Sequence, residues 1–140
     1  MDMKLELVIV PVSDIDRAKS FYADQVGFVV DHDQTVSEEI RFVQLTPAGS
    51  ACSIAFGRGI STMEPGSLKA LQCVIADAGA ARAELAGRGV EVSDVDEQTW
   101  GKFVYFTDPD GNSWSLQELP DWSTGAGGSG QRPEGADQTG

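Results

Sequence analysis

The chain has 140 residues, of which 41% are hydrophobic, and this suits the packed interior of one ordinary domain. Its 22 acidic residues outnumber its 10 basic ones, so the formal net charge is −12 at pH 7. Such a charge repels phosphate backbones and anionic lipid surfaces, and we therefore exclude nucleic acid and membranes as partners.

No apolar run approaches the roughly 20 residues that a membrane-spanning helix needs. The first residues, MDMKLELVIVPV, lack the basic start and small-residue cleavage site of a secretion signal. Two cysteines, Cys52 and Cys73, are too few for a disulfide scaffold. We therefore expect a cytoplasmic protein in which both thiols are reduced.

The first half of the chain begins with the apolar run LVIVPV, which predicts a strand. Ser13 or Asp14 then caps a helix that ends at Gly27. The apolar stripe of this helix consists of Ile15, Ala18, Tyr22 and Val26. Three strand-like runs follow, namely GFVVD, IRFVQLT and CSIAF.

The second half repeats this order. An apolar run, LQCVIA, leads to the capping residue Asp77 and to a helix that ends at Gly87 or Gly89. The strand-like runs GVEVSDV, KFVYFT and SWSLQEL follow. The turn PAGS at 47–50 matches PDGN at 109–112 with an offset of 62, close to the 63 between Asp14 and Asp77.

The repeat predicts an α+β domain over residues 1–122, made of two βαβββ modules. Module one covers 5–56, a linker covers 57–67, and module two covers 68–119. Residues 123–140 contain no Val, Ile, Leu or aromatic residue. Such a segment cannot bury enough surface to offset its ordering entropy, so we predict a disordered tail rich in Gly and Ser.

The turn DPDGN at 108–112 is predicted to be structural. Pro109 presets φ, Asp108 can accept hydrogen bonds from its own backbone, and Gly111 accepts a positive φ. A calcium loop starting at Asp108 would need Gly at position 6 and Glu at position 12, where Ser113 and Leu119 stand.

Three segments resemble the vicinal oxygen chelate superfamily, which includes glyoxalase I, bleomycin-resistance proteins and extradiol dioxygenases. They are VPVSDIDRAKSFYADQVGF at 10–28, CVIADAGAARAELAGRGVEV at 73–92 and WGKFVYFTDPDGNSWSLQEL at 100–119. The resemblance implies two βαβββ modules whose mixed sheet curls into a cup with the helices outside. It also implies a homodimer, with clefts for ligand or metal near the interface.

The metal enzymes of this superfamily typically use four positions inside the cup. By the resemblance, these positions carry Leu7, Ser53, Ala70 and Ser115. Zinc and iron require several imidazole, thiolate or carboxylate ligands, and the whole chain contains one histidine. We therefore expect no metal site and no cofactor.

Strand alternation instead predicts a cup lined by apolar, aromatic and neutral polar side chains. This composition suits a small organic ligand, and it also suits a closed cup filled by its own side chains. A planar ligand could stack on Trp100, which could equally be a core or interface aromatic. The predicted ligand-binding residues are Leu7, Ile9, Ser53, Gln72, Trp100, Phe103, Tyr105, Ser115 and Gln117.

Two further candidate residues carry or can gain a positive charge. His32 stands between Asp31 and Asp33, where carboxylates can raise its pKa, but its place after GFVV is typical of a solvated turn. Arg41 is either a cation inside the cup or an exposed strand residue.

The leading hypothesis is a metal-independent protein that binds a small, antibiotic-like or aromatic molecule, like bleomycin-resistance proteins, and acts by sequestration. Its negative charge would steer a cationic ligand. The alternative is a superfamily enzyme, a lyase, isomerase or dioxygenase with an atypical active site. It would need either a metal site assembled from unexpected groups or metal-free acid–base chemistry, with Tyr105, Gln72 or His32 as the candidates. A third reading is an interaction protein with a filled cup.

Overall fold

A computed structural model describes residues 1–121, so the predicted tail and Trp122 lie outside the described residues. Module one contains β1 (Leu7–Ile9), α1 (Ile15–Ser20), the π-helix η1 (Phe21–Val26), β2 (Val29–Thr35), β3 (Arg41–Thr46) and β4 (Ser53–Arg58). Module two contains β5 (Leu71–Ile75), α2 (Ala78–Gly87), β6 (Asp96–Gln98), β7 (Gly101–Thr107) and β8 (Ser113–Glu118). This order confirms the predicted α+β fold of two βαβββ modules.

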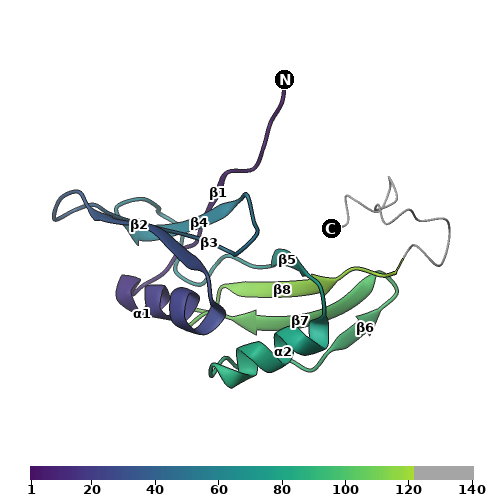
Figure 1. Cartoon of the computed structure of the whole chain (residues 1–140). Coiled ribbons are helices and arrows are strands. Elements are labelled where there is room, and N and C mark those ends of the chain that lie inside the picture. Colours follow the sequence, from purple (N-terminus) through teal and green to yellow (C-terminus); the bar gives the residue numbers. More distant parts are fainter. Residues whose placement is uncertain (122–140) are drawn as a thin grey trace.

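Each module forms its own mixed sheet of four strands (Figure 1). The strand orders are β1-β4-β3-β2 and β5-β8-β7-β6, in which β1 is parallel to β4 and β5 is parallel to β8. The other neighbours are antiparallel. The strands of the expected cup are therefore divided between two sheets within this part of the chain.

Both helices begin directly after an aspartate that was predicted to cap them. The carboxylate of Asp14 accepts a hydrogen bond from the backbone N–H of Arg17, and that of Asp77 accepts one from Ala80. The first helix continues from α1 into η1 and ends at Gly27, whose φ of +97° is left-handed. The π-helical turn was not predicted.

The segment before β6 differs from the prediction. The run GVEVSDV at 89–95 is not a strand, and the only regular strand in this region is Asp96–Gln98. The backbone of Ser93 donates to the carbonyl of Tyr105, but the Ser93 hydroxyl, rather than a carbonyl, accepts from the N–H of Tyr105. The Ser93 side chain thus replaces a backbone carbonyl as the acceptor, and regular pairing with β7 starts only at Asp96.

One hydrophobic core joins the two modules. The Tyr22 ring lies 5.9 Å from the Phe56 ring of β4 and 5.7 Å from the Trp114 ring of β8. The ring of Phe21 contacts Phe106 of β7 at 6.1 Å. The end of the first helix therefore packs against both sheets, and the apolar faces of β4, β7 and β8 share one interior.

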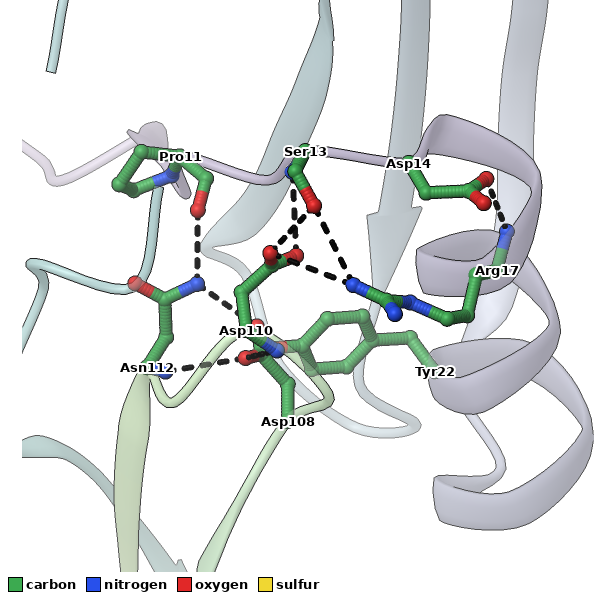
Figure 2. Close-up of polar contacts among 8 residues, drawn as sticks. All are labelled: Pro11, Ser13, Asp14, Arg17, Tyr22, Asp108, Asp110 and Asn112. Atoms are coloured by element: carbon green, nitrogen blue, oxygen red, sulfur yellow. Dashed lines mark hydrogen bonds and ion pairs between the residues drawn. The ribbon is translucent and has the colours of Figure 1, made fainter. Parts of the chain in front are cut away.

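Buried hydrogen bonds join the DPDGN turn to the side chains of this core (Figure 2). The carboxylate of Asp108 accepts hydrogen bonds from the Tyr22 hydroxyl at 2.7 Å and the Asn112 side-chain amide at 2.8 Å. It also accepts from the backbone N–H groups of Asp110 and Asn112, both at 2.9 Å. The indole of Trp114 donates to the Tyr22 hydroxyl at 2.9 Å. The predicted structural turn is confirmed, and it connects β8 to the first helix.

The same turn holds the chain just before α1 (Figure 2). The side chain of Asn112 donates to the carbonyl of Pro11 at 2.8 Å. The carboxylate of Asp110 accepts from the backbone and the hydroxyl of Ser13 and from Arg17. Because these contacts cross between the modules, they fix the relative position of the two sheets.

The shared core covers one side of each sheet, and we call the opposite side the cup face. Strand pairing places Leu7 beside Ser53 and Ile9 beside Ala55 on the cup face of module one. In module two it places Ser115 beside Gln72 and Tyr105.

Within residues 1–121, no helix is long and apolar enough to cross a membrane.

Candidate functional site

A cavity of about 440 Å³ opens on the cup face of module two. It lies over β7 and β8, next to Ala70, the residue before β5. This volume falls within the range of roughly 300–1,000 Å³ that is typical of small-molecule sites. The residues that line it are Ala70, Glu91, Tyr105, Phe106, Thr107, Ser113, Trp114 and Ser115.

A chain of hydrogen bonds crosses the polar part of this face. The hydroxyl of Ser115 donates to the Gln72 side-chain oxygen at 3.0 Å, and the Gln72 amide donates to the Gln117 side-chain oxygen at 2.8 Å. The amide of Gln117 then donates to the backbone oxygen of Trp100 at 2.8 Å. Ser115 and Gln117 are buried, whereas Gln72 is exposed, so Gln72 is the member of the chain that can exchange partners with a ligand.

Aromatic side chains form the neighbouring surface. The rings of Phe103 and Tyr105 lie 6.1 Å apart and within 10° of parallel. Phe103 is buried, but 40% of Tyr105 is exposed. Trp100 lies in the turn before β7 and is 56% exposed. The exposed rings of Tyr105 and Trp100 are available to stack on a planar molecule.

The hydroxyl of Tyr105 is engaged by a carboxylate. It donates to Asp96 at 2.7 Å, and this hydrogen bond, together with partial burial, raises the pKa of Tyr105 to about 12. The same bond, with a second from Gln98, lowers the pKa of Asp96. Tyr105 therefore stays protonated near neutral pH, where it can donate a hydrogen bond but is a poor general base.

Three predicted residues lie on the other sheet. Leu7, Ile9 and Ser53 share the cup face of module one, where Ser53 is buried. The hydroxyls of Ser53 and Thr46 lie 2.6 Å apart, and Thr46 also donates to Asp31. These residues do not line the module-two cavity within a single chain.

Of the predicted residues, Tyr105 and Ser115 line the cavity. Gln72, Phe103 and Gln117 adjoin it on the same face of the sheet. Ala70 was implied only as a metal position, and the other five lining residues were not predicted: Glu91, Phe106, Thr107, Ser113 and Trp114. Strand alternation from Tyr105 could have found Thr107, whereas Glu91 lies in the segment that was wrongly predicted as a strand.

The structure corrects one of the four positions implied for a metal. The residue paired with Ser115 is Gln72, and Ala70 precedes it by two positions. In module one, Ser53 pairs with Leu7, which stands seven positions before the capping residue Asp14. In module two, the corresponding Gln72 stands only five positions before the capping residue Asp77. A shift of two residues keeps the same face of the strand.

The corrected set still contains no imidazole, thiolate or carboxylate, because it consists of Leu7, Ser53, Gln72 and Ser115. Across residues 1–121, no group of three or more His, Cys, Asp and Glu side chains is placed to hold a metal ion. The set of donors that zinc or iron needs is thus missing from these four positions.

The two charged candidates also have defined places. His32 lies within β2, not in a turn, and pairs with Gln44, but it is exposed. Arg41 is not a cation of the cup: its guanidinium contacts Asp33 at 2.9 Å and Asp16, in the first turn of α1, at 3.0 Å. Hydrogen bonds from Arg41 and from Lys19 hold the pKa of Asp33 well below its usual range.

Comparisons with known proteins agree with this fold. Residues 4–116 match the Glyoxalase/Bleomycin resistance protein/Dioxygenase superfamily. TnmS3, an antibiotic-binding protein from Streptomyces sp. CB03234, is similar in structure, with a TM-score of 0.77 and 37% identity. The match covers 85% of this chain and 98% of that one.

A glyoxalase/bleomycin resistance protein from the same Streptomyces strain is 38% identical, with a TM-score of 0.72, over 81% of this chain and 99% of that one. The uncharacterized protein YetH of Bacillus subtilis is 27% identical over 124 residues, which are 84% of this chain and all of YetH. The fold and the site define a two-module α+β protein of the glyoxalase type. The chain belongs to the Glyoxalase/Bleomycin resistance protein/Dioxygenase superfamily.

Proposed function

We propose that this protein binds a small organic molecule, antibiotic-like or aromatic in character, without using a metal ion. The observation that carries the proposal is the cavity of about 440 Å³ on the cup face of module two, with its aromatic and neutral polar surroundings. The likeness to TnmS3, an antibiotic-binding protein, supports it. Its role would be sequestration of the ligand in the cytoplasm.

Each part of the site has a distinct task in this proposal. The exposed rings of Tyr105 and Trp100 supply the surface on which a planar group stacks, and the buried ring of Phe103 packs beside Tyr105. The chain of hydrogen bonds through Ser115 and Gln72 fixes the orientation of polar groups on the ligand. Burial then contributes affinity, and the hydrogen bonds contribute specificity.

The charge around the cavity favours a cationic ligand. Glu91 lines the cavity and Asp96 holds the Tyr105 hydroxyl, whereas neither Lys nor Arg is among the described residues that line it. The net charge of −12 would steer cations toward the protein over longer distances.

The proposed site is completed in a homodimer. In one chain, Leu7, Ile9 and Ser53 occupy a sheet separate from the module-two cavity. We propose that the module-one cup face of one protomer closes over the module-two cup face of its partner. Both sets of predicted residues then contact one ligand.

The enzyme alternative would need either metal donors or a group able to move protons. The described residues provide no cluster of metal donors, and the hydrogen bond with Asp96 makes Tyr105 a poor base. Gln72 does not titrate, and His32 lies outside the cavity. Sequestration without chemistry is therefore the function that the site supports best.

A thermal-shift and calorimetry series with planar aromatic antibiotics and glycopeptide antibiotics tests the proposal. A ligand present at 100 times its Kd should stabilise the protein by about 2.7 kcal/mol. Tyr105→Ala should weaken binding at least tenfold. The control Lys102→Ala, on the opposite side of β7, should leave binding unchanged.

Two results would contradict the proposal. One is the absence of stabilisation by every compound of the series, which would favour a filled cup. The other is retention of Zn, Fe, Mn or Ni through dialysis of untagged protein, at half an equivalent or more by elemental analysis. Retained metal would show that donors outside the predicted positions form a site.

A further inference from the structure

A β-bulge in β2 directs two of its aspartates to opposite faces of the module-one sheet. The pairing of β2 with β3 shifts register between Val30 and His32, which makes Asp31 an additional residue of β2. Without this extra residue, Asp31 and Asp33 would point to the same side, because side chains alternate along a strand. Instead Asp33 lies on the helix side, where it contacts Lys19 at 2.7 Å. Asp31 lies on the cup face.

A chain of hydroxyl groups connects this aspartate to the buried Ser53. The Thr46 hydroxyl donates a hydrogen bond to the Asp31 carboxylate and lies 2.6 Å from the Ser53 hydroxyl. Because the single hydrogen of the Thr46 hydroxyl is directed at Asp31, the hydrogen in the second contact comes from Ser53. Ser53 lies on the cup face beside Leu7. The chain therefore runs from Ser53 through Thr46 and ends on the carboxylate.

The carboxylate of Asp31 has room for a further donor. Asp31 is exposed, its Oδ1 atom accepts no hydrogen bond and it forms no ion pair with any of residues 1–121. The arginines of β3 and β4 are engaged elsewhere, since Arg41 contacts Asp33 and Arg58 donates to the backbone oxygen of Glu38. A carboxylate in this state accepts most strongly from a charged donor.

An apolar side chain adjoins this carboxylate on the cup face. Val29 pairs with Thr46 and is 55% exposed. The corresponding chain in module two ends differently, because it runs from Ser115 through Gln72 and Gln117 to an uncharged backbone oxygen. Of these two chains, only the one in module one ends on a charge, next to a surface that a hydrocarbon group can cover.

We propose that Asp31 selects ligands that carry a protonated amine, by accepting a hydrogen bond from the ammonium group on the module-one cup face. This inference rests on the proposed function and names the chemical class of its ligand, an aromatic compound with a basic amine. An ammonium group gains both a hydrogen bond and charge attraction at this position. An aromatic acid is repelled there, because the carboxylate and the Ser53 oxygen offer it no hydrogen.

Three naphthalene compounds of the same shape test the selection. They are 2-naphthylmethylamine, which is cationic, 2-naphthalenemethanol, which is neutral, and 2-naphthoate, which is anionic. Calorimetry with the wild-type protein should show the amine binding about tenfold more tightly than the acid, with the alcohol between them. In heteronuclear NMR spectra, the amine should shift the backbone amide signals of Asp31, Thr46 and Ser53.

Asp31→Asn tests the carboxylate itself, because the amide oxygen still accepts from Thr46 while the charge is lost. This variant should bind the amine about fivefold more weakly and the alcohol as the wild type does. The matched control Asp33→Asn removes the same charge from the other face of β2 and should leave the binding of both compounds unchanged. Glu91→Gln, in the module-two cavity, should weaken amine binding less than Asp31→Asn does. Circular dichroism checks that all three variants are folded.

The outcomes separate this inference from the proposed function. Failure of the amine to bind, or equal binding of the amine and the acid, would refute the selection by Asp31. Equal binding of the amine by Asp31→Asn and the wild type would also refute it, as would a larger loss in Glu91→Gln. The proposed function would still stand in each case if the antibiotic series binds and Tyr105→Ala weakens that binding. Failure of the whole antibiotic series would contradict the proposed function, whereas an amine that depends on Asp31 would still support the selection.

Discussion

The hydroxyl of Tyr22 offers the sharpest test of how the two modules are held together. It donates to Asp108 at 2.7 Å and accepts from the Trp114 indole at 2.9 Å. Burial, with the nearby Asp108 carboxylate, raises the pKa of Tyr22 far above its usual value, so this hydroxyl is a donor at every relevant pH. The substitution Tyr22→Phe removes it while the ring contacts remain.

The expected cost follows from the two lost hydrogen bonds. Asp108 keeps three other donors, so losing one hydrogen bond to a carboxylate costs about 1.5 kcal/mol. The buried indole N–H of Trp114 is left without a partner, which adds about 1.5 kcal/mol. We expect the free energy of unfolding to fall by about 3 kcal/mol, or Tm by roughly 10 °C for a chain of this length.

Urea unfolding of the wild type and the variant, followed by tryptophan fluorescence, measures this difference. Tyr105→Phe is the control, because it also removes a hydroxyl bonded to a carboxylate, but at an exposed site where water replaces the lost partner. If both substitutions change the free energy of unfolding equally, the argument that the buried contacts fasten the modules is refuted. Trp114→Phe should cost less in the Tyr22→Phe background than in the wild type, because the two side chains share one hydrogen bond.

Three more results are expected. The hydrogen bonds from Arg41 lower the pKa of Asp33 in the folded state, so the stability they give is present above the unfolded pKa of about 4 and is lost below it. Asp33→Asn should therefore lose less Tm than the wild type between pH 7 and pH 3, and an equal loss would contradict this. Ser115→Glu should not create zinc affinity measurable by calorimetry, because one carboxylate is insufficient; tight uptake would reveal other donors. Gly66→Ala should lower the free energy of unfolding in urea by about 3 kcal/mol, since φ at Gly66 is +82° and an added Cβ would lie 2.0 Å from a backbone oxygen. Gly111→Ala should lower it by only about 1 kcal/mol, because φ at Gly111 is +99° but the space around an added Cβ is open. Equal costs would contradict that reasoning.

Periodicity was sufficient to predict the elements that depend on local chemistry. Asp14 and Asp77 cap their helices, and Gly27 ends the first, because capping needs only a short polar side chain and a left-handed residue. Strand parity placed Leu7 with Ser53 and Tyr105 with Ser115 on one face, because alternation is a property of any pleated strand.

Features that depend on contacts between distant residues were not predictable in this way. The partner of Ser115 is Gln72 and not Ala70, because the connection to the helix is shorter in module two. The place of His32 in a strand follows from pairing with Gln44, which no local pattern indicates. Strand alternation assigned Leu7 and Tyr105 to the inside of one cup, but it could not show that the two residues lie on separate sheets.

The separation between the shared core and the cup face has an evolutionary consequence. Tyr22, Phe56 and Trp114 hold the interior on one side of the sheets, whereas Gln72 and Tyr105 lie on the other side, exposed to solvent. Exposed residues generally tolerate replacement with little loss of stability. Under the proposed function, selection can therefore change the ligand that is bound without rebuilding the scaffold.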